Sequence, residues 1–261
     1  MEEKTAVEQQ GTVPAINNSV KSTPPAKVPE GMLTLGEGFE EPIQSGDLRL
    51  SRAVVVQPTT KEFINDPQRF KLGTLIDNIT LNVLPMKFVP IMKFTFWIKF
   101  NPKDKNDPNF DPAYDLGAII YRTSNPQDER VIKDGNFGEN DEKPRATKYI
   151  NYLCVFEGER LPIILSFSKT SLKAGVNLFN IAFRRGGNMY DGQYSLKTIQ
   201  KESDQGGHYY IMEVEQSGDS DEKTRAIARY FREHFSKLVK PMEDLVVLTE
   251  EQAEPSEARP Y

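Results

Sequence analysis

The sequence has few residues of the kinds that build metal centres and disulfide frameworks. Its 261 residues include one cysteine, Cys154, and two histidines, His208 and His234. One cysteine excludes a disulfide framework within the chain and a thiolate metal cluster. Two histidines cannot complete a typical zinc site without carboxylate ligands. We therefore expect no metal and no cofactor, and a reducing, cytoplasmic setting.

The sequence also lacks long apolar runs and the motifs of common enzymes. No apolar run approaches the roughly 20 residues of a membrane span, and the acidic start MEEKTAVEQQ does not resemble a secretory signal. There is no Walker A, GxGxxG, GxSxG or HExxH pattern. These absences favour a binding protein that is not an enzyme and that does not contact a membrane.

Charge is distributed unevenly along the chain. Residues 1–46 carry a net charge of −4 and residues 241–261 carry −5, so that residues 47–240 carry +4 within a total of −5. The first 46 residues are rich in polar residues, proline and glycine and show no hydrophobic period, which predicts a disordered arm. We expect one domain over 47–240 and an acidic flexible tail over 241–261.

The longest regular pattern runs from Lys87 to Asn101, KFVPIMKFTFWIKFN. Read with a period of two, it predicts a long strand that bends or bulges around a barrel. Its apolar face comprises Phe88, Pro90, Met92, Phe94, Phe96, Ile98 and Phe100. Its other face comprises Lys87, Val89, Ile91, Lys93, Thr95, Trp97 and Lys99. The only tryptophan thus lies between lysines, an arrangement that suits stacked bases and paired phosphates. The alternative places Trp97 in a satellite core.

Further short strands are indicated by apolar and β-branched residues. They are expected at 53–56, 72–84, 116–121, 149–156, 161–167, 194–200 and 208–215. The segments 149–156 and 161–167 flank Glu157-Gly158-Glu159-Arg160, a connection typical of a hairpin. Cys154 lies in the first of these segments, where we expect it to be a small buried residue.

Two helices are expected. The first follows Ser168 and ends at Arg184-Arg185-Gly186-Gly187, where basic residues favour the negative end of the helix dipole. Its apolar face is predicted from the spacing of Leu172, Val176, Phe179 and Phe183. The second helix spans 220–239, with Asp219 and Glu222 at the spacing of a capping box. Its apolar stripe comprises Ile227, Tyr230, Phe231, Phe235 and Leu238.

The run LPIILSFSKTSLKAG at 161–175 resembles a segment of bacteriophage replication and recombination proteins that are thought to bind single-stranded DNA. The layout around it is similar too, with AVVVQ at 53–57, the long aromatic strand, and GGHYYIMEVE at 206–215. The resemblance covers about 47–215. It implies an oligonucleotide-binding (OB) barrel and an acidic C-terminal tail ending in an aromatic residue, here Tyr261. The predicted elements from 88 to 215 fit the order of that barrel if one strand is an insertion.

These features favour a mainly β chain with two helices. Together with the resemblance, they imply an OB-fold-like barrel with insertions that binds single-stranded DNA without reading sequence in phage DNA replication or recombination. The candidate nucleic-acid contacts are Lys93, Trp97, Lys99, Lys169, Lys173, Arg184, Arg185, Tyr194 and Tyr209. The tail is expected to contact replication or transcription proteins through Glu250, Glu251, Glu254, Glu257 and Tyr261.

Three alternatives remain open. In the first, Arg184 and Arg185 stabilise only the negative end of the helix dipole and do not contact phosphate. In the second, the chain is a polymerase-associated transcription or replication cofactor, and the tail matters more than Trp97. In the third, it is a structural or assembly protein that does not bind nucleic acid, and the aromatic strand is an oligomer interface.

Overall fold

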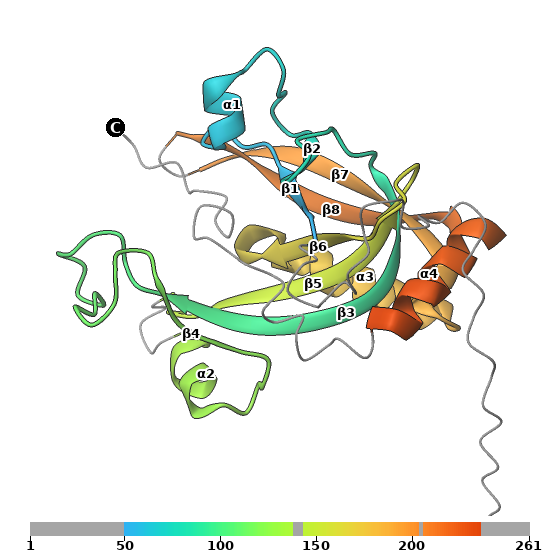
Figure 1. Cartoon of the computed structure of the whole chain (residues 1–261). Helices are drawn as coiled ribbons and strands as arrows, with labels where there is room; N and C mark the ends of the chain where they lie inside the picture. Colours follow the sequence, from blue (N-terminus) through green and yellow to red (C-terminus); the bar gives the residue numbers. More distant parts are fainter. Residues whose placement is uncertain (1–49, 138–142, 204–205, 236–261) are drawn as a thin grey trace, which may run out of the picture.

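The computed structural model describes residues 50–137, 143–203 and 206–235 (Figure 1). These residues form the strands β1 (Arg52–Val55), β2 (Leu75–Asp77), β3 (Lys87–Phe100), β4 (Ile119–Thr123), β5 (Thr147–Phe156), β6 (Ile163–Ser168), β7 (Gly192–Glu202) and β8 (His208–Asp219). The helices are α1 (Lys61–Asn65), α2 (Glu129–Asp134), α3 (Leu172–Arg185) and α4 (Glu222–Phe235), with 3-10 turns η1 (Lys169–Ser171) and η2 (Met189–Asp191).

The mainly β class is confirmed, and both predicted helices are present as α3 and α4. The helices α1 and α2 were not expected, because segments of five and six residues are too short to show a hydrophobic period. The predicted N-terminal arm, the acidic tail and the last residues of the helix predicted over 220–239 lie outside the described residues.

One sheet organises the fold. Its strand order is β2-β1-β6-β5-β3-β7-β8, and β4 pairs with β3 off this path. All pairs are antiparallel except β1 with β6. The sheet curls into a half-barrel, and α3 packs against β5, β6 and β8 (Figure 1). The succession β3, β5, β6, α3, β7, β8 is compatible with an OB-fold-like barrel if β4, which lies off the path of the sheet, is counted as an insertion.

A bulge divides β3 into two halves. The register with β5 shifts between Pro90 and Met92, so Ile91 is an extra residue that reverses the faces of all later side chains. Ile91 and Phe96 consequently pack in the same cluster. The predicted faces were therefore wrong in part, because the bulge separates the first three residues of the mixed face from the last four. The separated residues are Lys87, Val89 and Ile91 on one side of the bulge and Lys93, Thr95, Trp97 and Lys99 on the other.

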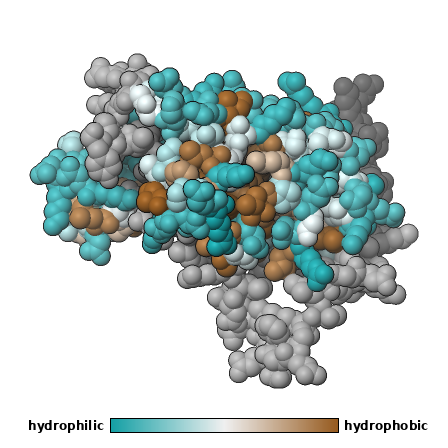
Figure 2. Space-filling model, turned by 90° about the horizontal axis from the view of Figure 1, so that it is seen from above, coloured by the Kyte–Doolittle hydropathy of each residue, from teal (hydrophilic) through white to brown (hydrophobic). Residues whose placement is uncertain are grey.

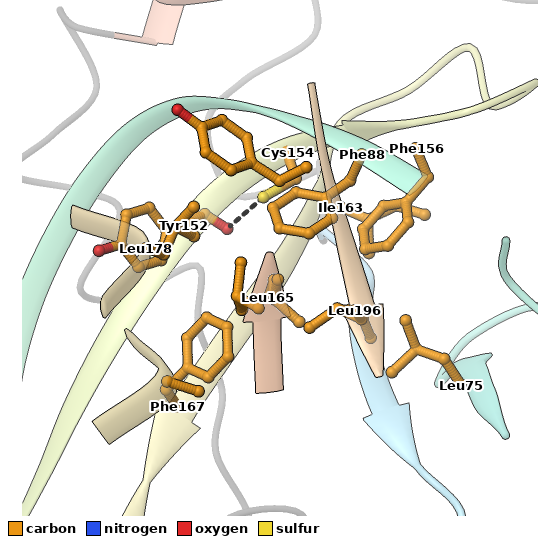
Figure 3. Packing of buried hydrophobic residues seen from close by; sticks show 14 of the residues in the cluster. Leu75, Phe88, Tyr152, Cys154, Phe156, Ile163, Leu165, Phe167, Leu178 and Leu196 are labelled. Carbon is orange, nitrogen blue, oxygen red and sulfur yellow. Dashed lines mark hydrogen bonds between the residues drawn. The ribbon is translucent and has the colours of Figure 1, made fainter. Parts of the chain in front are cut away.

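Hydrophobic cores lie on both faces of β5. The inner core fills the curl of the sheet and includes Tyr152, Cys154 and Phe167, whose packing is drawn in Figure 3. Cys154 is fully buried, as expected, and this burial raises the pKa of its thiol. The outer core contains Leu153 and Val155 of β5 and lies under α4, which contributes Ala228 and Phe231. The packing of both cores thus depends on the register of β5 with its neighbours.

Side chains cover the free edge of β8. The amide of Gln57 donates to the carbonyl of Tyr210 at 2.7 Å and accepts from its backbone N–H at 2.8 Å. Farther along the edge, the Met212 N–H donates to Ser171 Oγ at 3.2 Å, and Asn177 Nδ2 donates to the Val214 carbonyl at 3.3 Å. We call this row of bonds the β8 seam. It satisfies alternate residues of β8 without a neighbouring strand.

Replacing Gln57 by alanine should weaken the β8 seam most, because it leaves both backbone groups of Tyr210 without their partner. We expect the free energy of unfolding in urea to fall by about 2–3 kcal/mol. Gln127 is exposed, so Gln127→Ala is the matched control. Equal unfolding free energies for the two variants would contradict a closing role for Gln57.

The start of α4 differs from the predicted capping box. Asp221 is the capping residue, since its carboxylate accepts from the Thr224 backbone N–H at 2.9 Å and from the Thr224 hydroxyl at 2.6 Å. These bonds lower the pKa of Asp221. Asp219 instead forms an ion pair with Arg185 at 2.8 Å. The cap therefore lies two residues later than predicted, and Asp219 ties β8 to the end of α3.

Candidate nucleic-acid interface

The second half of β3 presents polar and aromatic side chains to the concave side of the sheet. Lys93 lies opposite Tyr152 of β5, and Trp97 lies opposite Lys148. Directly opposed residues share a face, so these four side chains lie on the face of the inner core. The Lys148 ammonium is 5.4 Å from the centroid of the Trp97 ring. A cation of β5 thus lies beside the Trp97 ring.

Helix α3 turns a different face to the sheet from the one predicted. Its buried residues are Ala174, Gly175, Leu178 and Ala182. The small residues let the helix lie close to the barrel, and the Tyr152 hydroxyl donates to the Gly175 carbonyl at 2.7 Å. The predicted stripe of Leu172, Val176, Phe179 and Phe183 was wrong as a core face, since its last three members are exposed.

The exposed rings of α3 lie beside the lysine of β3. Phe179 is 38% exposed and Phe183 is 76% exposed, and their rings stack with centroids 6.0 Å apart at an interplanar angle of 21°. The Lys93 ammonium lies 4.5 Å from the centroid of Phe179, within the range of a cation–π contact. We call Lys93, Trp97, Lys148, Phe179 and Phe183 the aromatic–lysine surface. It joins two strands and a helix that are far apart in the sequence.

The charges of the aromatic–lysine surface repel one another. Partial burial lowers the pKa of Lys93, and the charge of Lys148 lowers it further. An anion bound between the two ammonium groups would offset that repulsion, because its negative charge would attract both. The arrangement therefore combines flat apolar rings, which can stack on bases, with two cations that can pair with phosphates.

Lys99 has a structural partner. Its ammonium pairs with the Asp134 carboxylate of α2 at 2.9 Å, and the Tyr121 hydroxyl donates to the same oxygen at 3.3 Å. Trp97 packs partly against the small cluster that includes Tyr121 and Val131, which agrees with the satellite core considered as an alternative. These contacts fix α2 against β3 and hold one side of the Trp97 ring.

The remaining predicted cations lie toward the two ends of α3. Lys173 and Arg184 are about 17 Å apart along the helix axis, given 1.5 Å per residue, so they do not converge on one contact. Arg185 lies in the last turn of α3, where the helix-end alternative placed it, and it also pairs with Asp219 of β8. Lys169 lies in η1 with a backbone φ of 44° and is exposed. The candidate tail contacts lie outside the described residues.

The two predicted tyrosine contacts occupy different environments. Tyr194 is fully buried and packs against Phe88 in the inner core, so its proposed stacking role was wrong. Burial raises the pKa of its hydroxyl. Tyr209 is half-buried on β8, opposite Lys201 of β7. The error on Tyr194 arose because a strand position alone does not say which face becomes the core.

Replacing Tyr194 by phenylalanine should leave the protein intact. The buried Tyr194 hydroxyl has no hydrogen-bond partner in the part of the chain that the structure describes. Its removal should leave the free energy of unfolding unchanged or raise it by about 1 kcal/mol, as measured in urea. A loss of more than about 1 kcal/mol would show that the hydroxyl makes a bond in solution.

Sequence reasoning missed Lys148, Phe179 and Phe183 as surface residues. Lys148 lies just before the strand predicted at 149–156, whereas the structure places it within β5, opposite Trp97. The surface position of the two rings could have been predicted from Ala174, Leu178 and Ala182, which recur every four residues and form a second face of the helix. The larger side chains were assigned to the core because burying a large apolar side chain usually stabilises a fold more than burying a small one.

Comparisons with known proteins give one family. A family model described as Pam3 phage gp34-like protein matches residues 18–239, which is more than half of the chain. Neither the curated proteins nor the solved structures contain a match. No helix among residues 50–137, 143–203 and 206–235 is long and apolar enough to cross a membrane. Within those same ranges, no group of three or more histidine, cysteine or acidic side chains is placed to hold a metal ion.

Proposed function

The chain belongs to the Pam3 phage gp34-like protein family, and we propose that it binds single-stranded DNA without reading sequence, in phage DNA replication or recombination. The observation that carries this proposal is the contact of Lys93 with Phe179 beside the exposed, stacked Phe183. The surface thus combines rings, which can stack on bases, with ammonium groups, which can pair with phosphates.

The aromatic–lysine surface favours single strands over duplexes. Bases in a duplex are already stacked and paired, so their faces cannot reach Phe183 or Trp97. An unpaired base can lie on a ring and gains about 1–3 kcal/mol by stacking. Stacking uses the face that all bases share, and for this reason we expect little preference for sequence.

Lysines would supply the part of the affinity that depends on salt. Lys93 and Lys148 would each displace a condensed cation from the phosphates, so binding should weaken as the salt concentration rises. The half-barrel and its strand order support the proposal at the level of the fold, because OB barrels commonly bind oligonucleotides.

Fluorescence anisotropy of a labelled oligo-dT at about 50 and 300 mM salt tests this function directly, with a labelled duplex as control. We expect binding to oligo-dT that weakens at the higher salt and that the duplex does not match. The absence of oligo-dT binding at the lower salt, both for the full chain and after removal of residues 242–261, would overturn the proposal.

A second candidate is a structural or assembly protein of the phage. The observation that favours it is the apolar ridge of Val176, Phe179 and Phe183 on α3, since contiguous exposed apolar side chains often mark protein interfaces. Apolar residues also gather in the middle of the mostly hydrophilic face in Figure 2. A defined multimer in sedimentation that is lost in Phe183→Ala and ignores oligo-dT would support this candidate.

A further inference from the structure

Arg52 is buried in the sheet without a carboxylate partner among the described residues. Its side chain on β1 is 5% exposed, and one guanidinium nitrogen donates to Ser166 Oγ at 3.0 Å. Ser166 in turn donates to Asn151 Oδ1 at 2.6 Å. The Nε and Nη1 atoms of Arg52 are buried and have no hydrogen-bond partner in the described part of the chain. Buried guanidinium groups are normally paired with an anion.

A second guanidinium increases the charge near Arg52. Burial lowers the pKa of Arg52 to about 10; Tyr149 acts in the opposite direction, and the charge of Arg122 lowers the pKa further. Arg122 lies over the ring of Phe96 at 4.8 Å. The pairing of Phe96 with Tyr149, and of Asn151 with Ser166, places this polar band on the outer face of the sheet. The band crosses the sheet from β1 to β4.

The path of the chain indicates which segment can reach this band. Leu50, the first described residue, packs on the outer cluster, so the chain enters β1 from the outer face. The band spans four strand spacings, about 19 Å, which about six extended residues can cross. The eight residues between Glu41 and Leu50 are enough for the chain to turn back over β1, so Glu40 and Glu41 could reach Arg52, and Leu33, Leu35 and Phe39 precede them in the sequence.

We propose that residues 32–41 dock on the outer face of the sheet and that a carboxylate of Glu40 or Glu41 pairs with Arg52. The acidic tail is the less suitable occupant, because the family match takes in residues 18–49 and ends at 239, before the tail begins. The apolar residues of the segment suit the half-buried Phe94 and Phe100 of the outer cluster. This docking is independent of DNA binding, since it uses the opposite face of the sheet.

Nuclear magnetic resonance of the Arg52 Nε–H in the full chain tests the docking, with the signal assigned by Arg52→Lys. We expect slow exchange with water in the wild type and exchange at least about tenfold faster in the double variant Glu40→Gln, Glu41→Gln, because a hydrogen bond to a charged group is lost. The matched control is Glu250→Gln with Glu251→Gln, which should leave the exchange rate unchanged.

A double-mutant cycle supplies a readout that does not need this signal. The variant of Glu40 and Glu41 should lower the folding equilibrium constant at least about tenfold in the wild type and have little effect when Arg52 is methionine. If Arg52→Met does not fold, the exchange measurement decides alone. An unchanged exchange rate in the Glu40 and Glu41 variant, or faster exchange in the tail variant, would overturn the proposal.

Discussion

Replacing Phe179 and Phe183 together by alanine will lower the affinity for oligo-dT by about thirtyfold or more. The two rings provide the exposed stacking area of α3, and losing about 1 kcal/mol of stacking at each ring gives this factor. The Phe179 ring also holds Lys93 at 4.5 Å, so the lysine loses its preferred position as well. The measurement is a titration by fluorescence anisotropy at about 50 mM salt.

The control for the ring variant is Leu161→Ala, which removes an exposed apolar side chain at the β5–β6 turn. It should bind oligo-dT as the wild type does. Unfolding in urea should show that both proteins are fully folded under the conditions of the titration, because neither Phe179 nor Phe183 belongs to a hydrophobic core cluster. Equal affinities for the ring variant and the control would exclude α3 from the interface.

The substitution Gly175→Ala will destabilise the protein by about 2–3 kcal/mol, although the same change in an ordinary helix raises stability by about 1 kcal/mol. A β-carbon at this position would lie 2.8 Å from Cβ and 3.0 Å from Cγ of Phe167. These atoms are at the base of a buried side chain on β6, so they cannot move aside easily. Helix α3 must therefore shift outward, which would strain the bond from Tyr152 to the Gly175 carbonyl.

Urea unfolding measures this effect, and Asn180→Ala on the exposed face of α3 is the matched control. The control should be neutral or slightly stabilising, since alanine favours the helix. In a Phe167→Ala background, Gly175→Ala should cost less stability, because alanine lacks the Cγ and Cδ2 atoms that lie 3.0 and 3.1 Å from the new methyl group. Higher stability for Gly175→Ala alone would contradict the close approach of helix and sheet.

The sequence allowed good prediction where one periodic pattern ran without interruption. The long strand was placed at Lys87, as observed, and the hairpin around Gly158 follows from its turn residues. The faces of β3 could not be predicted past Pro90, since nothing local marks the extra residue of the bulge. That single residue decides whether Trp97 faces the inside or the outside of the sheet.

The candidate site was harder to predict than the fold, because partners distant in sequence decide which polar residues are available. Lys93 and Trp97 lie on the concave face as the proposed site requires, whereas Asp134 engages Lys99 and Asp219 engages Arg185. Neither ion pair has a signal in the local sequence. Phe179 and Phe183 were assigned to the core because they belong to the face of α3 with the larger side chains. The face with Ala174, Gly175 and Ala182 packs on the sheet instead, because its small side chains let the helix come closer.

The β8 seam also limits how copies of this chain can associate. An exposed strand edge offers backbone N–H and carbonyl groups to a strand of another molecule and so promotes ordered aggregation. On β8 the groups at Tyr210, Met212 and Val214 are already bonded to side chains. Substituting Gln57, Ser171 and Asn177 together would expose that edge, and concentrated protein would then be expected to form intermolecular β-sheet. The side chains that cover the β8 edge therefore prevent strands of other copies from pairing there and extending the sheet into a filament.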